Sequence, residues 1–300
     1  MPRLYVVATP IGNLSDMTPR ALETLRGVGL IAAEDTRVTR ALLNHFDIDT
    51  PAVSNHQHNE AHRASPLIER MLSEGIDMAV VTDAGTPCIS DPGSVLVREA
   101  AAAGIEVLAV PGPTAMASAL SVSGFDTREF AFYGFLPRGG KELREKLVAM
   151  KKSGVPVGVV HESPHRVVEL VETIAKTLPG CRISASCDLT KLHEKTIRGT
   201  AEEVLAMLRA NEKAEKGEYC LVLDMTEVTL EAEEAASSAS LEAQLFEEML
   251  SGFDLRQAAL TLTERGHKRN DVYRARTNVQ RFLDDLMSDY TLEEEDDSDE

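Results

Sequence analysis

Several carboxylates stand where an apolar segment of the chain ends, which is where acidic side chains most often do chemistry in a parallel sheet. Glu34 and Asp35, Asp83 and Glu162 all have this placement. Ligands of open α/β sheets bind outside the carboxyl ends of the strands. These carboxylates can therefore meet a ligand, accept its hydrogen bonds or favour a positive charge on it. The alternatives are local, since Asp35 can cap the following helix and Asp83 can bond to its own loop.

Two glycine- and proline-rich turns follow neighbouring apolar segments. They are Asp-Ala-Gly-Thr-Pro at 83–87 and Pro-Gly-Pro at 111–113. Neither is the glycine-rich loop of a dinucleotide fold or of a P-loop. Their prolines remove amide donors, so the turns suit an uncharged adenosine or a cationic sulfonium better than a pyrophosphate. A single turn of this kind is often a plain connection, but two of them predict one small-molecule site.

The elements that position these turns alternate between strand and helix patterns, which predicts a doubly wound α/β domain followed by a second α/β series. In the first series we expect strands at 4–8, 30–33, 78–82 and 107–110 and helices at 18–26, 38–45, 60–73, 91–104 and 114–122, with the helix at 60–73 broken or bent near Pro66. In the second we expect strands at 130–134, 155–160, 183–186 and 219–224 and helices at 140–152, 165–177 and 201–210.

Length and composition also predict more than one domain. The chain has 300 residues, 43% of them hydrophobic, which is enough for two cores. The predicted organisation is an N-terminal α/β domain at 1–115, a second at 116–230, a linker at 231–240, a helical segment at 241–288 that could bind RNA, and a disordered acidic tail at 289–300.

The net charge of −18 argues against a nucleic-acid partner until its distribution is considered. Acidic residues gather in the linker and the tail, whereas the seven basic residues that follow residue 230 all lie in 255–283, beside only two acids. No apolar run is long enough to span a membrane and no signal peptide is evident, so a cytoplasmic protein is expected. His56, His58 and His62 lack a fixed acidic or cysteine partner, and no metal site is predicted.

Seven segments together resemble one family, in that family's order. They are 7–14 (VATPIGNL), 33–37 (AEDTR), 83–87 (DAGTP), 111–113 (PGP), 134–137 (GFLP), 162–166 (ESPHR) and 189–191 (LTK). Over about residues 3 to 285 the chain resembles the bacterial 16S ribosomal RNA (cytidine-1402-2′-O)-methyltransferases, which are tetrapyrrole methylase-like enzymes. The chain departs from that pattern at His161, where an aromatic residue is usual, and at Cys187 and Asp188, where Arg-Glu is usual.

The resemblance implies two α/β domains with S-adenosyl-L-methionine in the cleft between them, and a homodimer. It implies that the cofactor is bound by Pro10, Asp83, Gly85, Thr86, Pro87, Pro111, Gly112, Pro113 and Ala115. Methyl transfer requires the attacking oxygen to lie in line with the methyl–sulfur bond, and positioning supplies much of the rate. Gly85 and Gly112 would let the backbone approach the cofactor closely.

The substrate implied is a cytidine in 16S ribosomal RNA or in the 30S subunit. A ribose hydroxyl is a weak acid, so a positioned base would help, and Glu34, Asp35, Glu162 and Lys191 all remain candidates. RNA contacts are expected from Arg37, His58, Arg138, Lys141, Arg166, Lys268 and Arg269. The alternatives are a methyltransferase acting on a tetrapyrrole or another small molecule, or a non-catalytic ribosome-assembly factor.

Overall fold

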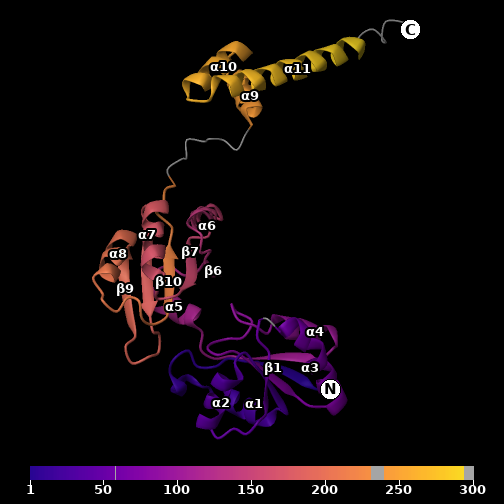
Figure 1. Ribbon diagram of the computed structural model, residues 1–300, viewed down its shortest axis with the longest axis vertical. Helices are drawn as coiled ribbons and strands as arrows, with labels where there is room; N and C mark the ends of the chain where they lie inside the picture. Colours follow the sequence, from indigo (N-terminus) through magenta and orange to yellow (C-terminus); the bar gives the residue numbers. More distant parts are fainter. Residues whose placement is uncertain (58, 231–239, 294–300) are drawn as a thin grey trace. The chain divides into compact units, whose positions relative to one another are not determined.

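The computed structural model describes residues 1–57, 59–230 and 240–293, and the chain divides into two compact units, Met1–Leu230 and the residues after it (Figure 1). The first unit contains two five-stranded sheets. The fold class predicted from the sequence is confirmed, since both sheets are flanked by helices and the last segment is helical. Among the described residues, no helix is long and apolar enough to cross a membrane.

The first sheet is wholly parallel, with the strand order β3-β2-β4-β1-β5. Its strands are β1 Arg3–Val7, β2 Leu30–Ala33, β3 Ala52–Ser54, β4 Met78–Val81 and β5 Glu106–Val110, and its helices are α1 Pro19–Gly27, α2 Thr36–His45, α3 Glu60–Glu74 and α4 Ser94–Ala102. Leu30–Ala33 and Met78–Val81 are buried throughout, as strands covered by helices on both faces must be. The parallel arrangement places the ends of β1, β4 and β5 at one edge.

The second sheet is mixed, with the order β6-β7-β10-β8-β9. Its strands are β6 Phe130–Phe135, β7 Val157–Glu162, β8 Arg182–Cys187, β9 Lys195–Thr200 and β10 Tyr219–Asp224. Strand β10 runs antiparallel to both of its neighbours, β7 and β8. The first residue of β10 therefore lies beside the last residue of β7, and the register pairs Tyr219 with Glu162.

Helices cover the two faces of the second sheet. They are α5 Ala115–Ser123 on one side and α6 Gly140–Lys152, α7 Val167–Thr177 and α8 Ala201–Arg209. The larger core cluster contains Leu147, Ile174 and Leu221, whereas Ala119 of α5 packs with Val159 and Val222 of the sheet. Residues on one strand thus alternate between two cores, as a buried sheet requires.

Two strands were not expected from the sequence, and both lie at sheet edges. Ala52–Ser54 has three half-buried residues, and Lys195–Thr200 contains a single large apolar residue, Ile197. Edge strands bury less surface, so their apolar pattern is weak. Helix α4 begins at Ser94, later than the expected start at Asp91, because Cys88 and Ser90 have positive φ angles and the chain enters the helix at Gly93.

The second unit has its own core. Helices α9 Leu241–Leu250, α10 Leu255–Glu264 and α11 Arg269–Glu293 enclose Leu245, Leu262 and Val279. Helix α11 is longer than the short helices expected and continues into the segment predicted as the acidic tail. Residues 294–300 of that tail, and residues 231–239 of the predicted linker, lie outside the described residues.

Candidate functional site

A cavity of about 450 Å³ lies between the strand ends of the first sheet and one end of the second. Loops after β1, β4 and β5 contribute Ile11, Ala84, Gly85, Thr86, Ile89, Ser90, Asp91, Thr114, Ala115 and Met116. The second sheet contributes Phe135, His161, Glu162, Ser163, Pro164, Leu189, Glu218, Tyr219 and Cys220. The volume is typical of small-molecule sites.

The loop after β4 is fastened to the loop after β1. Gly85 and Thr9 exchange backbone hydrogen bonds, with N···O distances of 2.9 and 3.0 Å. Gly85 has φ +88°, and the nearest neighbour of a Cβ built there would be Ile11 at 3.5 Å. Glycine is thus required at this position for its backbone conformation more than for lack of space. The bridge holds the turn in place as one wall of the cavity.

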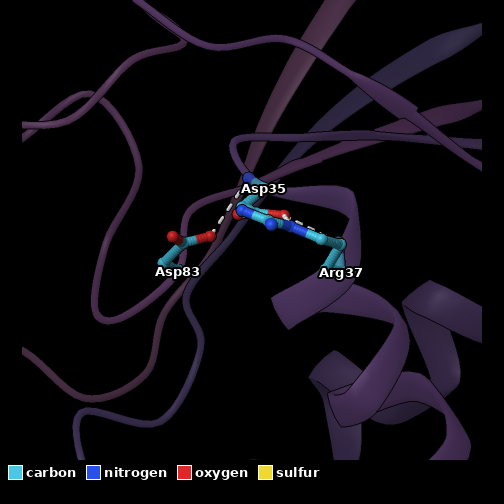
Figure 2. A network of polar contacts seen from close by, with 3 residues as sticks. All are labelled: Asp35, Arg37 and Asp83. Atoms are coloured by element: carbon cyan, nitrogen blue, oxygen red, sulfur yellow. Dashed lines mark hydrogen bonds and ion pairs between the residues drawn. The ribbon is translucent and has the colours of Figure 1, made fainter.

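Glu34 and Asp83 form a connected acidic cluster at the ends of β2 and β4. Glu34 Oε2 accepts hydrogen bonds from Thr82 Oγ1 at 2.5 Å and from the Asp83 amide at 3.1 Å. Asp83 Oδ1 in turn accepts from the Asp35 amide, while Arg37 folds back onto the Asp35 carboxylate (Figure 2). The Arg37 guanidinium lowers the pKa of Asp35 to about 2.

Asp91 is the acidic residue of this region that lines the cavity. Burial, together with the negative charges of Glu34 and Asp83, raises the pKa of Asp91 to about 6. A carboxyl that titrates near neutrality in a cavity is a candidate functional group. No group of three or more histidine, cysteine or acidic side chains within the described chain could hold a metal ion.

Glu162 is the most deeply buried carboxylate of the cavity, with a side chain only 1% exposed. Its Oε1 accepts a hydrogen bond from the Ser163 amide at 2.7 Å and lies 3.5 Å from a guanidinium nitrogen of Arg166. Its Oε2 is buried and has no hydrogen-bond partner in the described structure. A buried acceptor without a partner is costly, so this oxygen lacks a hydrogen-bond donor that a bound ligand could supply.

His161 is the residue that departs from the family pattern, and its ring occupies an aromatic setting. Its centroid lies 5.1 Å from that of Phe132 and 5.7 Å from that of Phe135. Burial lowers the pKa of His161 below its usual value. The imidazole is therefore neutral at pH 7 and replaces an aromatic ring in packing.

Lys191 lies beside the cavity and does not line it. Its ammonium donates hydrogen bonds to Asp188 Oδ1 and Glu218 Oε2, each at 2.9 Å. Burial alone would lower the pKa of Lys191, but these two carboxylates raise it above its usual value. Lys191 stays protonated and orients Glu218, which does line the cavity.

The structure places only some of the expected cofactor residues on the cavity: Gly85, Thr86 and Ala115. Pro10, Asp83, Pro87, Pro111, Gly112 and Pro113 are not among its lining residues. A Cβ built at Gly112 would lie 3.0 Å from Cβ of Ala8, so this turn packs closely against the end of β1. Pro113 contributes indirectly, because its carbonyl accepts a hydrogen bond from Thr86 Oγ1 at 3.5 Å.

Only one of the expected bases lines the cavity. It is Glu162, whereas Glu34 and Lys191 lie next to the cavity. Of the expected RNA contacts, Arg166 donates to the Pro137 carbonyl, and Lys141 pairs with Glu145. The remaining exposed ones are Arg37, Arg138, Lys268 and Arg269, the last two at the start of α11 in the second unit. His58 lies outside the described residues.

Sequence reasoning missed several cavity residues, namely Asp91, Phe135, Glu218 and Tyr219. Asp91 was interpreted as a helix start. Phe135 ends β6, a position where the strand-end rule could have found it. Glu218 and Tyr219 come just before and at the beginning of a strand, and only the antiparallel direction of β10 brings them to the cavity.

The model of the tetrapyrrole (corrin/porphyrin) methylases matches residues 3–205 of the chain. A ribosomal RNA small subunit methyltransferase I from Halalkalibacterium halodurans is 42% identical over 272 residues, which cover 90% of this chain and 93% of the relative. The protein of the same name from Escherichia coli O157:H7 is 40% identical and covers 91% and 93%. This chain belongs to the tetrapyrrole methylase family. As a member, it is a methyltransferase related to the small subunit methyltransferases I.

Solved structures share the fold. Diphthine synthase superimposes with a TM-score of 0.58 at 12% identity, covering 76% of this chain and 92% of its own. The methyltransferase CobJ superimposes with a TM-score of 0.55 at 18% identity, covering 75% and 95%. The matched part of this chain, 75% and 76%, is close to the share of the chain that forms the two sheets and their helices. The departures at His161 and Asp188 leave this fold intact, because the first packs as an aromatic ring and the second pairs with Lys191.

Proposed function

We propose that the protein transfers a methyl group from S-adenosyl-L-methionine to the 2′-hydroxyl of a cytidine in 16S ribosomal RNA, in the cytoplasm. Membership of the methylase family and more than 40% identity to ribosomal RNA small subunit methyltransferases I support this activity. The resemblance over the whole of the two sheets points to cytidine 1402. The observation that carries the reaction chemistry is the buried, unpartnered Oε2 of Glu162 in the cavity.

The cavity residues fit the cofactor. S-adenosylmethionine supplies an electrophilic methyl group on a cationic sulfur. The turn from Ala84 to Thr86 and the start of α5 would hold its adenosine with backbone groups and apolar contacts, and Ile11 would pack against it. The ionised form of Asp91 would stabilise the positive charge. The scarcity of cationic side chains on the cavity wall is what a cationic ligand requires.

Glu162 is proposed as the base that takes the proton of the ribose hydroxyl. Its Oε2 is free to accept, while the Ser163 amide and Arg166 hold the other oxygen and fix the orientation of the group. Lys191 is protonated and cannot accept a proton, and both hydrogen bonds to Glu34 Oε2 come from within the protein. A positioned base of this kind accelerates a reaction by about 10² to 10⁴.

The RNA would be held by basic residues on both units. Arg37 and Arg138 belong to the first unit, and Lys141 follows Arg138 in the same loop and helix start, whereas the Arg166 guanidinium is already engaged by Glu162 and the Pro137 carbonyl. On the second unit, Lys268 precedes α11 and Arg269 begins it. Half-buried Arg276 lies 5.1 Å from the ring centroid of Tyr273, which is exposed, in a cation–π pair. Exposed arginine and aromatic side chains contact phosphates and bases of single strands. Two copies of the chain are expected to act together as a homodimer, as the resemblance implies.

Mass spectrometry of the small-subunit RNA tests the function directly. RNA from a deletion strain should lack one 2′-O-methyl group, and the purified protein should restore it with S-adenosylmethionine. A protein that binds the cofactor but methylates a tetrapyrrole instead would contradict the proposed substrate. If a variant that cannot bind the cofactor restored the methyl group when expressed in the deletion strain, the protein would have an assembly role and another enzyme would transfer the methyl group.

Removing residues 241–300 tests what the second unit contributes to methylation. Because each unit has its own core, the truncated protein should bind the cofactor with an affinity within about twofold of the full chain. Methylation of small subunits should fall by about tenfold through lost phosphate contacts. Equal activity of the two proteins would assign these helices to dimerisation or stability.

A further inference from the structure

A second cavity, of about 480 Å³, opens on the side of the second sheet that α8 covers. Its lining residues include Asp188, Lys195, Ile197, Lys213, Lys216 and Tyr219. It is as large as the methyltransferase cavity, and the function proposed above makes no use of it. Its residues come from the β8–β9 hairpin, the end of α8 and the loop before β10.

The rim of this cavity is cationic. Lys195, Lys213 and Lys216 are all exposed, and none of their ammonium groups pairs with an acidic side chain in the described part of the chain. The acid that lines the cavity, Asp188, is already paired with Lys191. Glu212 and Glu215 alternate with the lysines in the loop but do not line the cavity.

Three unpaired lysines are unexpected in a protein with a net charge of −18. A lysine on an edge strand discourages pairing with other chains, which would account for Lys195 on β9. It does not account for Lys213 and Lys216, which lie in a loop. Met207 and Leu208 of the last turn of α8 also line the cavity, and the partial negative charge of a helix C-terminus is smaller than three ammonium charges.

The floor of the cavity is apolar. The larger core of the second sheet includes Leu208 and Tyr219, and Ile197 packs against it. Met207 is 44% exposed. An apolar floor beneath a cationic rim matches a ligand with a flat apolar body and an anionic group. A nucleotide has both, in its base and its phosphate.

The loop that carries the lysines is built close to the hairpin. Gly217 has φ +89°, and a Cβ built there would lie 2.5 Å from Asp188 Oδ2 and 2.8 Å from Cys187 Sγ. No other residue could let the loop approach so closely. Tyr219, two residues after Gly217, lines both cavities, so the two cavities meet at this residue.

We propose that this second cavity binds a nucleotide, with the three lysines on its phosphate and the apolar floor against its base. The shared residue Tyr219 makes it suitable for a nucleotide of the same RNA strand that enters the methyltransferase cavity. That source of the nucleotide rests on the proposed function, whereas the binding chemistry does not.

Lysine footprinting of the full-length wild-type protein tests the site without any measurement of methylation. The protein is acetylated with and without a single-stranded RNA of about ten nucleotides, and the modified lysines are quantified by mass spectrometry. We expect RNA to lower acetylation of Lys195, Lys213 and Lys216 by about threefold. Lys146, Lys152 and Lys176 lie on α6 and α7 and should be unaffected. Unprotected cavity lysines would overturn the proposal.

A matched pair of triple variants separates the site from general charge. K195Q/K213Q/K216Q should weaken RNA binding by about tenfold near 50 mM salt and reduce the salt slope by about 2, as expected for three lost phosphate contacts on a single strand. K146Q/K152Q/K176Q removes the same charge and should bind RNA as the wild type does. Equal losses in both variants would overturn the proposal.

Cytidine 5′-monophosphate and inorganic phosphate serve as further probes in the footprint. Protection by RNA with none by the mononucleotide identifies a polymer as the source, and protection by the mononucleotide identifies a free nucleotide site. Protection by inorganic phosphate to the same extent would contradict a role for the apolar floor. Protected lysines in a protein that fails to methylate RNA would leave this site standing and reject the proposed function alone.

Discussion

The acidic groups on the two sides of the methyltransferase cavity differ in how they are satisfied. On the first sheet, Glu34 and Asp83 are linked through Thr82 and backbone amides, and burial together with their charges raises the pKa of their neighbour Asp91. On the second sheet, Glu162 stands alone, deeply buried, with one oxygen paired and the other not. Glu34 and Asp83 together concentrate negative charge near Asp91, whereas Glu162 is a single hydrogen-bond acceptor with a fixed orientation.

This difference indicates a division of work. A cluster whose carboxylates repel one another stabilises a cation, as the sulfonium of the cofactor requires. A fixed carboxylate with one free oxygen can accept a proton from a defined direction. The comparison therefore predicts effects on cofactor binding from one side and on the rate of transfer from the other.

The largest effect is expected from Glu162→Gln. The amide keeps the shape of the side chain but cannot accept the proton, so single-turnover methylation should slow by about 10² to 10⁴. Cofactor affinity measured by calorimetry should change little. Glu169→Gln, an exposed change on α7, is the control and should keep the wild-type rate. An unchanged rate in Glu162→Gln would remove this residue from the chemistry.

Asp91 should make cofactor binding depend on pH. Its raised pKa of about 6 means that the carboxylate is ionised at pH 7.5 and mostly protonated at pH 5, so its attraction for the sulfonium is lost as the pH falls. We expect the affinity to fall by about tenfold between these values, the protonated fraction at pH 5 being about nine-tenths. Calorimetry at a series of pH values measures this.

The matched variant is Asp91→Asn, which should bind the cofactor weakly at every pH in that range. A wild-type affinity that does not vary with pH would show that Asp91 does not face the sulfonium. A variant that retains the pH dependence would assign it to another group.

Glu34→Gln should have a smaller effect, on the pH dependence of cofactor affinity. Removing the Glu34 charge removes one of the causes that raise the pKa of Asp91, so the midpoint of the pH dependence should move to a lower pH. The affinity at pH 7.5 should stay close to that of the wild type. A loss of methylation as large as that of Glu162→Gln would instead make Glu34 the base.

The smallest effect is expected from His161→Phe. The imidazole is neutral and packs against Phe132 and Phe135, so a phenyl ring should fit and leave methylation within about threefold of the wild type. A large loss of rate would show that His161 donates or accepts a hydrogen bond in the reaction. Steady-state methylation of small subunits is sufficient for this measurement.

Much of the first sheet was predictable because its strands are short apolar runs that end in glycine, proline or acidic residues. Leu30–Ala33 was predicted to the residue, and the helix cap at Thr18 is present, its hydroxyl accepting from the Ala21 amide at 3.2 Å. The edge strands β3 and β9 were missed, because strands that bury one side or less carry little apolar pattern.

The candidate site was predictable where it follows the ends of parallel strands. Gly85, Thr86 and Glu162 were found by this rule and line the cavity, whereas Gly112 is not among the lining residues and its cofactor contact stays a prediction. Glycine and proline in a sequence indicate a tight turn, but they do not indicate which distant residues pack against that turn. Asp91 was missed because an aspartate followed by proline is typical of a helix start.

The sequence by itself determined the family, the alternation of strands and helices and the strand-end carboxylates, since all of these depend on residues near one another in the chain. The tertiary structure decided which carboxylate is left with a free oxygen, which one has its pKa raised, and where Glu218 and Tyr219 lie. These properties arise from the direction of β10 and from the packing of distant loops, so they depend on contacts between residues far apart in sequence. Only the folded chain brings those residues together.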